Sequence, residues 1–73
     1  MPEDVKAHIT GVVFQIPTKP GDAVAAGDAV IVLESMKMEI AVCAPSDGLV
    51  REVRCGEGRA VQLGQALVIM ARP

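Results

Sequence analysis

Aromatic side chains are almost missing from this sequence. Its 73 residues include one Phe and no Trp or Tyr, although 51% of them are hydrophobic. A core must therefore be built from Val, Ile, Leu, Ala and Met. Seven Gly and five Pro in so short a chain indicate many turns. With a net charge of only −2, this composition predicts a small, turn-rich, all-β domain and excludes a disordered segment.

Runs of like charge and long apolar runs are also missing. The basic and acidic residues are interspersed, without a basic stripe or an aromatic stacking platform, so a nucleic-acid partner is not expected. The longest apolar stretches, residues 29–33 and 66–71, are far too short to cross a bilayer, so no membrane association is expected. The acidic start of the chain has no apolar h-region, which argues against a signal peptide.

Residues that usually carry chemistry are scarce as well. Two cysteines, Cys43 and Cys55, are too few for the disulfide framework of a small secreted scaffold, and they predict a reduced, cytoplasmic protein. The single histidine, His8, is expected to lie in a strand, and no second His or CxxC motif suggests a metal site. So small a chain has little room for both a core and an enclosed active site, so it is not expected to be an enzyme.

What the sequence does contain is an internal repeat. A shift of 37 positions, without any gap, superposes two halves of one domain that spans residues 1–73, with the halves at about 1–36 and 38–73. Conservative matches such as Val30 with Leu67 fill the positions between the identical ones. The identical pairs include Gly11 and Gly48, Val13 and Val50, Gly21 and Gly58, Ala23 and Ala60, Val24 and Val61, Gly27 and Gly64, and Ala29 and Ala66.

The repeat predicts one plan for both halves. Glycine turns at Gly21, Gly27, Gly58 and Gly64 are expected to need positive φ or tight packing. Each half has one apolar face that it cannot bury alone, so two halves must pack face to face. The expected architecture is a flattened two-sheet barrel or sandwich with pseudo-twofold symmetry. Strands are expected at residues 5–9, 11–16, 29–33, 38–43, 48–53 and 66–70, with very short ones at Val24 and Val61.

The midpoint of the repeat is the connection Met36-Lys37-Met38. Its symmetry mates are the chain ends, so this connection should project at the opposite end of the molecule. Met-Lys is not a favoured pair for a two-residue hairpin, and a turn held against local propensity suggests that its residues are kept for another reason. Periodicity alone favours core packing for Met36 and Met38, and strand alternation would then point Lys37 outward between them.

Here the sequence resembles a known family. The run Glu34-Ser35-Met36-Lys37-Met38-Glu39 is similar to the attachment motif of biotinyl domains, in which Met-Lys-Met surrounds the modified lysine. Ser35 stands where that family most often has Ala, and both residues are small. The similarity continues along nearly the whole chain, at Gly11, Pro20–Val24, Gly27-Asp28, Ala44-Pro45, Gly58–Val61 and Gly64-Gln65.

The resemblance implies the barrel-sandwich hybrid fold of biotinyl and lipoyl domains, with covalent biotin on Lys37. It implies three partners: a biotin protein ligase that forms the amide, a biotin carboxylase, and a carboxyltransferase that accepts the carboxyl group from biotin. Met36 and Met38 would then act as a recognition surface, with Glu34, Ser35 and Glu39 as hairpin context. The chain would be a non-catalytic biotin carboxyl carrier, and the carboxyltransferase would choose the acceptor.

Two other functions fit parts of the sequence. A lipoyl domain of a 2-oxo-acid dehydrogenase-type complex has the same fold, but its hairpin typically resembles Asp-Lys-Ala, whereas both neighbours of Lys37 are Met. An interaction domain with an unmodified lysine would also fit a tandem apolar repeat. It would, however, leave Met-Lys-Met at the midpoint as a coincidence.

Overall fold

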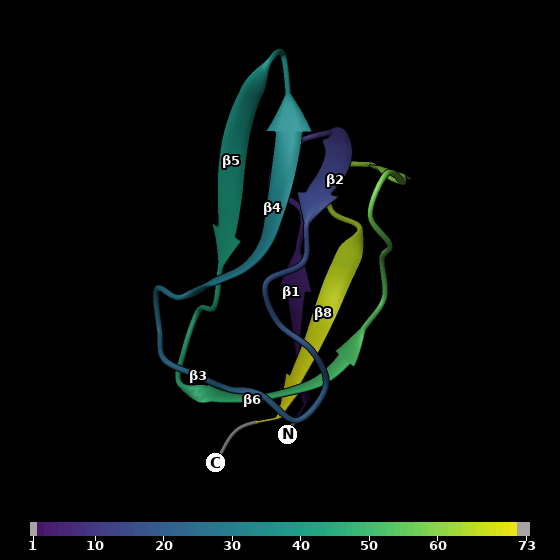
Figure 1. Cartoon of the computed structure of the whole chain (residues 1–73). Coiled ribbons are helices and arrows are strands. Elements are labelled where there is room, and N and C mark those ends of the chain that lie inside the picture. Colours follow the sequence, from purple (N-terminus) through teal and green to yellow (C-terminus); the bar gives the residue numbers. More distant parts are fainter. Residues whose placement is uncertain (1, 72–73) are drawn as a thin grey trace.

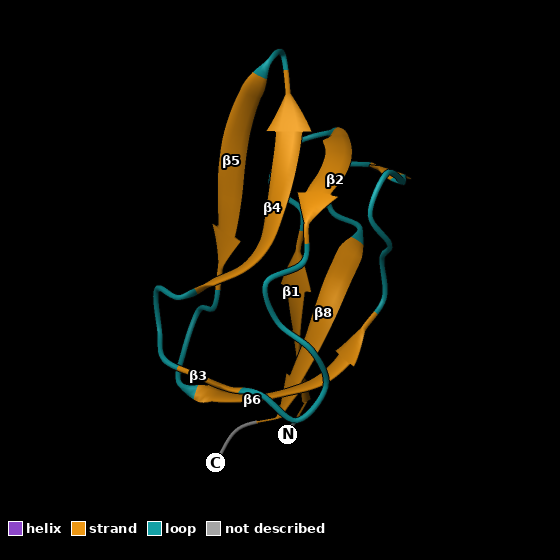
Figure 2. Cartoon of the chain, in the orientation of Figure 1, coloured by secondary structure: helices purple, strands orange, loops and turns teal. Residues whose placement is uncertain are grey.

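The computed structural model describes residues 2–71, which form strands joined by turns and loops and include no helix (Figure 2). The longer strands are rich in Val and Ile, whose branched side chains suit a pleated sheet. None of these residues belongs to a helix that could span a membrane. The strands are β1 (Pro2–Lys6), β2 (Gly11–Gln15), β3 (Ala23–Val24), β4 (Ala29–Ser35), β5 (Met38–Cys43), β6 (Gly48–Val53), β7 (Ala60–Val61) and β8 (Ala66–Ala71).

The strands form two antiparallel four-stranded sheets with matching topology. One sheet has the order β1-β8-β6-β3 and the other has the order β5-β4-β2-β7. Exchanging the two halves of the repeat converts the first order into the second, because β1 corresponds to β5, β2 to β6, β3 to β7 and β4 to β8. The predicted all-β barrel-sandwich with pseudo-twofold symmetry is therefore confirmed.

The turns repeat the same symmetry in their hydrogen bonds. The Gly21 N–H donates to the Val50 carbonyl oxygen over 2.8 Å, and its mate, the Gly58 N–H, donates to the Val13 oxygen over 2.9 Å. The four glycines expected at turns all have positive φ, as predicted. Their φ values are 98° for Gly21, 92° for Gly27, 81° for Gly58 and 87° for Gly64.

The apolar core lies between the two sheets and is built from symmetry-related pairs. Leu33 of β4 and its mate Met70 of β8 are 0% and 1% exposed, which places both at the centre. The other fully buried pairs are Val13 with Val50, Val30 with Leu67, and Ile31 with Val68. No described residue contributes a buried polar or charged side chain to this core.

The molecule is elongated, with principal extents of 35 × 17 × 17 Å. The β4–β5 hairpin projects from one end, while Pro2 of β1 and Ala71 of β8 pair at the other end (Figure 1). The expected separation of the midpoint loop from the two ends is therefore present. It follows that the chain can be held at one end while the hairpin stays accessible at the other.

The prediction for the first strand was wrong in its limits. A strand at residues 5–9 was expected, but β1 covers Pro2–Lys6, pairs with β8 from Pro2 to Lys6, and contains a register shift between Val5 and Lys6. Beyond it the Ala7 N–H donates to the Gln65 carbonyl oxygen, and the chain bends at His8, which is exposed rather than in a strand. Residue 1 and residues 72–73 of the predicted halves lie outside the described residues.

Candidate functional site

The hairpin between β4 and β5 has a two-residue turn made of Met36 and Lys37. Ser35 pairs with Met38, so no further residue is left in the loop. Both turn residues have positive φ, 53° for Met36 and 63° for Lys37. Two consecutive left-handed residues are what a type I′ turn requires, and this turn follows the right-handed twist of the strands. The predicted turn at the midpoint is therefore confirmed.

This backbone conformation is costly for the residues that adopt it. A residue with a Cβ atom loses roughly 1–2 kcal/mol in the left-handed region, and glycine or asparagine usually occupies such positions. Among residues 2–71, Met36 and Lys37 are the only residues other than glycine with positive φ. Strained backbone of this kind clusters at functional sites, so the turn is a candidate functional site.

The two methionines do not pack in the core. Met36 is 90% exposed and Met38 is 62% exposed, so the core-packing expectation is wrong. Its premise was strand alternation through residues 36–38, but alternation stops at the turn, where two left-handed residues redirect the chain. Both thioether side chains therefore flank Lys37 on the projecting tip as solvent-accessible apolar surface.

The base of the hairpin is fixed by a close approach of β2 to β4. A Cβ atom on Gly11 would lie 2.6 Å from the Glu34 carbonyl oxygen and 3.3 Å from the Ser35 Cβ atom. Only glycine allows this approach, and the half-buried Ser35 side chain is held next to it. The small residue before Met36 thus belongs to the anchor of the hairpin rather than to its exposed tip.

Two exposed carboxylates lie one step below the turn. Glu34 of β4 pairs directly with Glu39 of β5, so both side chains lie on the same face of the hairpin. Like charges directly opposite each other weaken a two-stranded pairing. This face therefore gives up some stability and presents negative charge beside Lys37.

Lys37 itself is exposed and free of ion pairs within residues 2–71. The one ion pair among these residues joins the Arg54 Nε atom to a Glu52 carboxylate oxygen over 3.3 Å, and it lies on β6 and the loop that follows. The Lys37 amine is thus accessible from solvent. The same residues contain no cluster of three or more His, Cys, Asp or Glu that could hold a metal.

One feature was missed by the sequence-based reasoning. A hollow of about 500 Å³ lies between the end of β6 and β7. We call it the Arg59 hollow; its lining residues are Val53, Arg54, Cys55, Gly56, Arg59, Ala60, Val61 and Gln65. The sequence repeat contained a signal for this hollow, because it pairs Arg59 with Asp22 and Gln65 with Asp28. The residues that line the hollow therefore differ in charge from their mates in the first half.

A small two-sheet domain that presents one exposed lysine on a rigid hairpin, opposite its paired ends, has the form of a carrier for an attached group. Residues 1–70 match the biotin/lipoyl family model, which is described as biotin-requiring enzyme. The chain therefore belongs to the biotin/lipoyl family, as its sequence predicts.

Relatives of very different length share this domain. The chain is 38% identical over 71 residues to the biotinylated protein TB7.3 homolog of Mycobacterium leprae, with 97% of this chain and 100% of that protein covered. It is 41% identical over 64 residues to the human mitochondrial propionyl-CoA carboxylase alpha chain, with 88% of this chain but only 9% of that chain covered.

A solved structure agrees over the same region. A single-chain, multi-domain long-chain acyl-CoA carboxylase superposes with a TM-score of 0.93 at 28% identity, covering 99% of this chain and 7% of that chain. The matching region thus covers the whole of one small relative but only a small part of a large carboxylase.

Proposed function

We propose that this chain is a biotin carboxyl carrier domain that holds biotin as an amide on the Nζ atom of Lys37. The observation that carries the proposal is the strained turn, in which Lys37 is exposed between two exposed methionines at the end of the molecule farthest from its paired ends. The relatives named above, a biotinylated protein and two carboxylases, support biotin as the attached group. The domain itself is a non-catalytic, cytoplasmic component.

Acylation of Lys37 needs an accessible amine and an external activating enzyme. An exposed lysine is mostly protonated at neutral pH and is a weak nucleophile. A biotin protein ligase would supply an activated biotinyl group and a base that takes the proton. The Nζ atom then forms the amide bond as the activating group leaves. The described residues place no carboxylate in an ion pair with the amine, so it can enter such an active site.

The rigid turn and the flexible lysine have separate roles in this proposal. Biotin, when attached, supplies the atom that holds the transferred carboxyl group. The β4–β5 turn fixes the point from which the lysine side chain extends, and the anchor at Gly11 and Ser35 keeps that point away from the body of the domain. Tethering raises the effective concentration of the attached group at each partner site.

The partner enzymes are expected to recognise the hairpin tip. Met36 and Met38 offer flexible apolar surface that adapts to different binding sites, and the Glu34–Glu39 pair adds negative charge on one face. A ligase, a biotin carboxylase and a carboxyltransferase must all accept Lys37, so each must accommodate these neighbours. The acceptor is selected by the carboxyltransferase and not by this domain.

The direct test is the intact mass of the chain before and after incubation with biotin, ATP and a biotin protein ligase. The expected result is one added biotinyl group, which is lost in Lys37→Arg and retained in the matched variants Lys6→Arg and Lys19→Arg. Both control lysines are exposed, so exposure alone would not distinguish them from Lys37. Addition to Lys37→Arg would overturn the assigned site.

The lipoyl alternative is tested with the same sample. A folded, unmodified chain that gains no mass with the biotin ligase is incubated with lipoate, ATP and a lipoate ligase. Mass gain only in the second reaction would replace biotin with lipoate on the same lysine. No gain in either reaction would favour an unmodified interaction domain.

A further inference from the structure

The repeat places two equivalent turns on opposite sides of the molecule. In the first half the Asp22 N–H donates to the Lys19 carbonyl oxygen over 3.1 Å, and in the second half the Arg59 N–H donates to the Gly56 oxygen over the same distance. Gly21 and Gly58 occupy the third position of their turns with φ of 98° and 81°. The two turns thus have closely similar backbones, so a hydrogen bond that is present in one turn and absent from the other can be identified.

The first turn is closed by a carboxylate. The Lys19 N–H donates to the Asp22 Oδ2 atom over 2.9 Å, which satisfies the amide at the start of the turn. The equivalent amide in the second turn belongs to Gly56, and the residue equivalent to Asp22 is Arg59, which carries no acceptor. Within residues 2–71 the Gly56 N–H has no hydrogen-bond acceptor.

Of the three backbone amides that donate to a side chain in the described turns of the first half, only the Lys19 amide has an equivalent without such an acceptor. Side chains accept from the Ala25 and Gln62 amides in the two halves, over 2.9 Å and 3.1 Å. They also accept from the Ala26 and Leu63 amides, over 2.8 Å and 3.2 Å. Both of these contacts are preserved across the repeat, whereas the contact to Gly56 is not.

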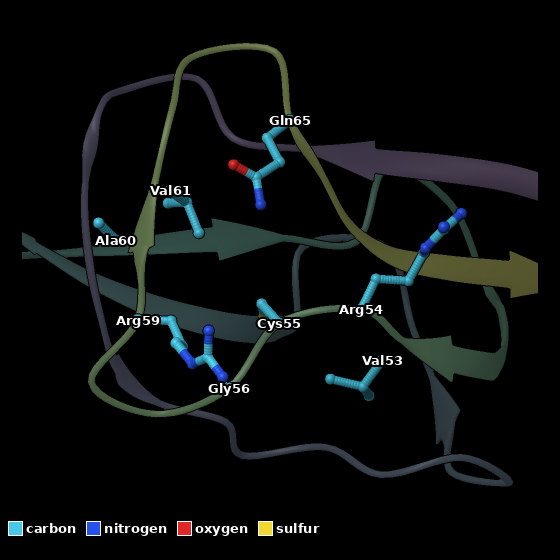
Figure 3. Close-up of a pocket in the computed structure, with 8 residues that line it drawn as sticks. All are labelled: Val53, Arg54, Cys55, Gly56, Arg59, Ala60, Val61 and Gln65. Carbon is cyan, nitrogen blue, oxygen red and sulfur yellow. The ribbon is translucent and has the colours of Figure 1, made fainter.

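The residue that replaces Asp22, Arg59, packs against Gly56. A Cβ atom on Gly56 would be 3.6 Å from the Arg59 Cγ atom, so the arginine stem packs against this glycine. Figure 3 shows the Arg59 guanidinium beside Gly56, whereas Arg54, which is paired with Glu52, extends away from them. An unpaired guanidinium next to an open N–H is a combination that carboxylates bind well.

We infer that the Gly56 N–H and the Arg59 guanidinium form a binding site for a carboxylate group supplied by another molecule. The carboxylate takes the place that the Asp22 side chain holds in the first half. One oxygen accepts from the Gly56 amide and the other accepts from Arg59. The site is separate from Lys37 and does not depend on biotin.

The rest of the Arg59 hollow suits this ligand. Val53 and Val61 provide an apolar surface, the Gln65 side chain points into the hollow in Figure 3, and none of the described lining residues is acidic. Burial raises the pKa of the Cys55 thiol above its ordinary value, so the thiol stays neutral at pH 7 and adds no negative charge. A small carboxylate with an apolar part, or an acidic side chain of a partner protein, would fit.

The test is a titration of the ¹⁵N-labelled chain followed by the amide resonance of Gly56. Sodium acetate replaces sodium chloride at constant ionic strength, which removes general screening effects. The expected result is a saturating downfield shift of the Gly56 amide. A parallel titration with the capped peptide acetyl-Gly-Asp-Gly-amide distinguishes the source, because saturation by the peptide alone would assign the site to an acidic side chain of a partner.

Two variants of Arg59 give opposite controls. Arg59→Gln removes the charge and should weaken binding on the order of tenfold, as expected for a lost charge-assisted hydrogen bond. Arg59→Asp copies the first half and should close the turn with its own carboxylate. The Gly56 amide then starts at the shifted position and no longer responds to acetate. Arg51→Gln, at an exposed arginine outside the hollow, should titrate like the parent chain.

Three results would overturn the inference. These are a Gly56 shift no larger than that of the exposed Gly27, a response that survives in Arg59→Asp, and an equal loss in Arg51→Gln. Unchanged spectra elsewhere in each variant would show that the fold is retained. The chain used is unmodified at Lys37, so a negative result here leaves the biotin proposal intact, and failure of biotinylation leaves this site intact.

Discussion

Met36 and Met38 are the largest exposed apolar side chains on the projecting end, at 90% and 62% exposure, and a residue so exposed contributes little to the core. Replacing either with Leu keeps the apolar surface but removes the flexible thioether. We expect Met36→Leu and Met38→Leu to leave the melting temperature nearly unchanged and to slow biotinylation or carboxyl transfer. Melting curves and single-turnover rates, measured on the same preparations, check this.

Leu63, 68% exposed and on another turn, provides the matched control, because Leu63→Met makes the reverse exchange outside the Met36-Lys37-Met38 turn. It should change neither the melting temperature nor the rates. If Met36→Leu or Met38→Leu lowered the melting temperature without changing either rate, the methionines would stabilise the fold and would not be recognised by the partner enzymes.

Thr18 has a role that only the structure reveals. Its Oγ1 hydroxyl donates to the Val30 carbonyl oxygen over 3.0 Å, whereas the equivalent oxygen of Leu67 accepts from the Arg54 backbone N–H over 2.8 Å. The mate of Arg54 is Pro17, which has no N–H, so the neighbouring hydroxyl replaces the missing donor.

Thr18→Val should therefore leave the Val30 carbonyl oxygen without its donor. The expected cost is about 1–2 kcal/mol of unfolding free energy, because a partly buried acceptor loses its partner. Urea unfolding measures this, with Thr18→Ser as the control that keeps the hydroxyl. Equal stability of the Val and Ser variants would show that water satisfies this oxygen.

At the scale of the element, the hairpin combines strain with accessibility. Asparagine adopts the left-handed conformation more readily than methionine. Met36→Asn should therefore raise the unfolding free energy by about 0.5–1 kcal/mol. The same change removes an apolar side chain beside Lys37 and should slow biotinylation. A variant that is more stable and equally fast would show that the turn is strained for no functional reason.

Strands and turns were not equally visible in the sequence. The repeat located the central strands, the positive φ glycines and the midpoint turn, because these depend on spacing and on glycine. The first strand was misplaced because Val5 and Ile9 suggested a local apolar pattern, although the mate of β5 under the repeat ends at residue 6. The exposure of Met36 was hidden, since alternation does not apply through a left-handed turn.

The unmatched contacts between the halves could not be read from either half alone. Whether the Gly56 amide has an acceptor depends on the side chain at Arg59, and whether Val30 keeps a donor depends on Thr18. Both become visible only when equivalent hydrogen bonds are compared in three dimensions. The cofactor suggested by the Met-Lys-Met motif, biotin, agrees with the biotin/lipoyl family and its biotinylated relatives, whereas Lys37 as the attachment residue stays a prediction.

At the scale of the whole molecule, the pseudo-twofold symmetry places two equivalent turns toward opposite ends of the domain. The Leu63 turn lies near the hairpin, because the Leu63 N–H bonds to the Thr10 Oγ1 atom and the adjoining Gly11 contacts Ser35. The Ala26 turn is its mate. The Ala26 N–H bonds to Asp47, and the adjoining Gly48 lies against the Ala71 carbonyl oxygen at the paired ends.

Because these two turns are equivalent, the same insertion can be made near either end of the domain and its effects can be compared. A small folded domain, inserted with flexible linkers after Leu63, should slow biotinylation because it occupies space on the hairpin side of the domain, next to the base of the hairpin. The same insertion after Ala26 should leave the rate nearly unchanged, since it lies toward the paired ends. Both are exposed turn positions, which tolerate insertions well. Equal slowing at matched stability would mean that the ligase contacts far more of the domain than the hairpin end.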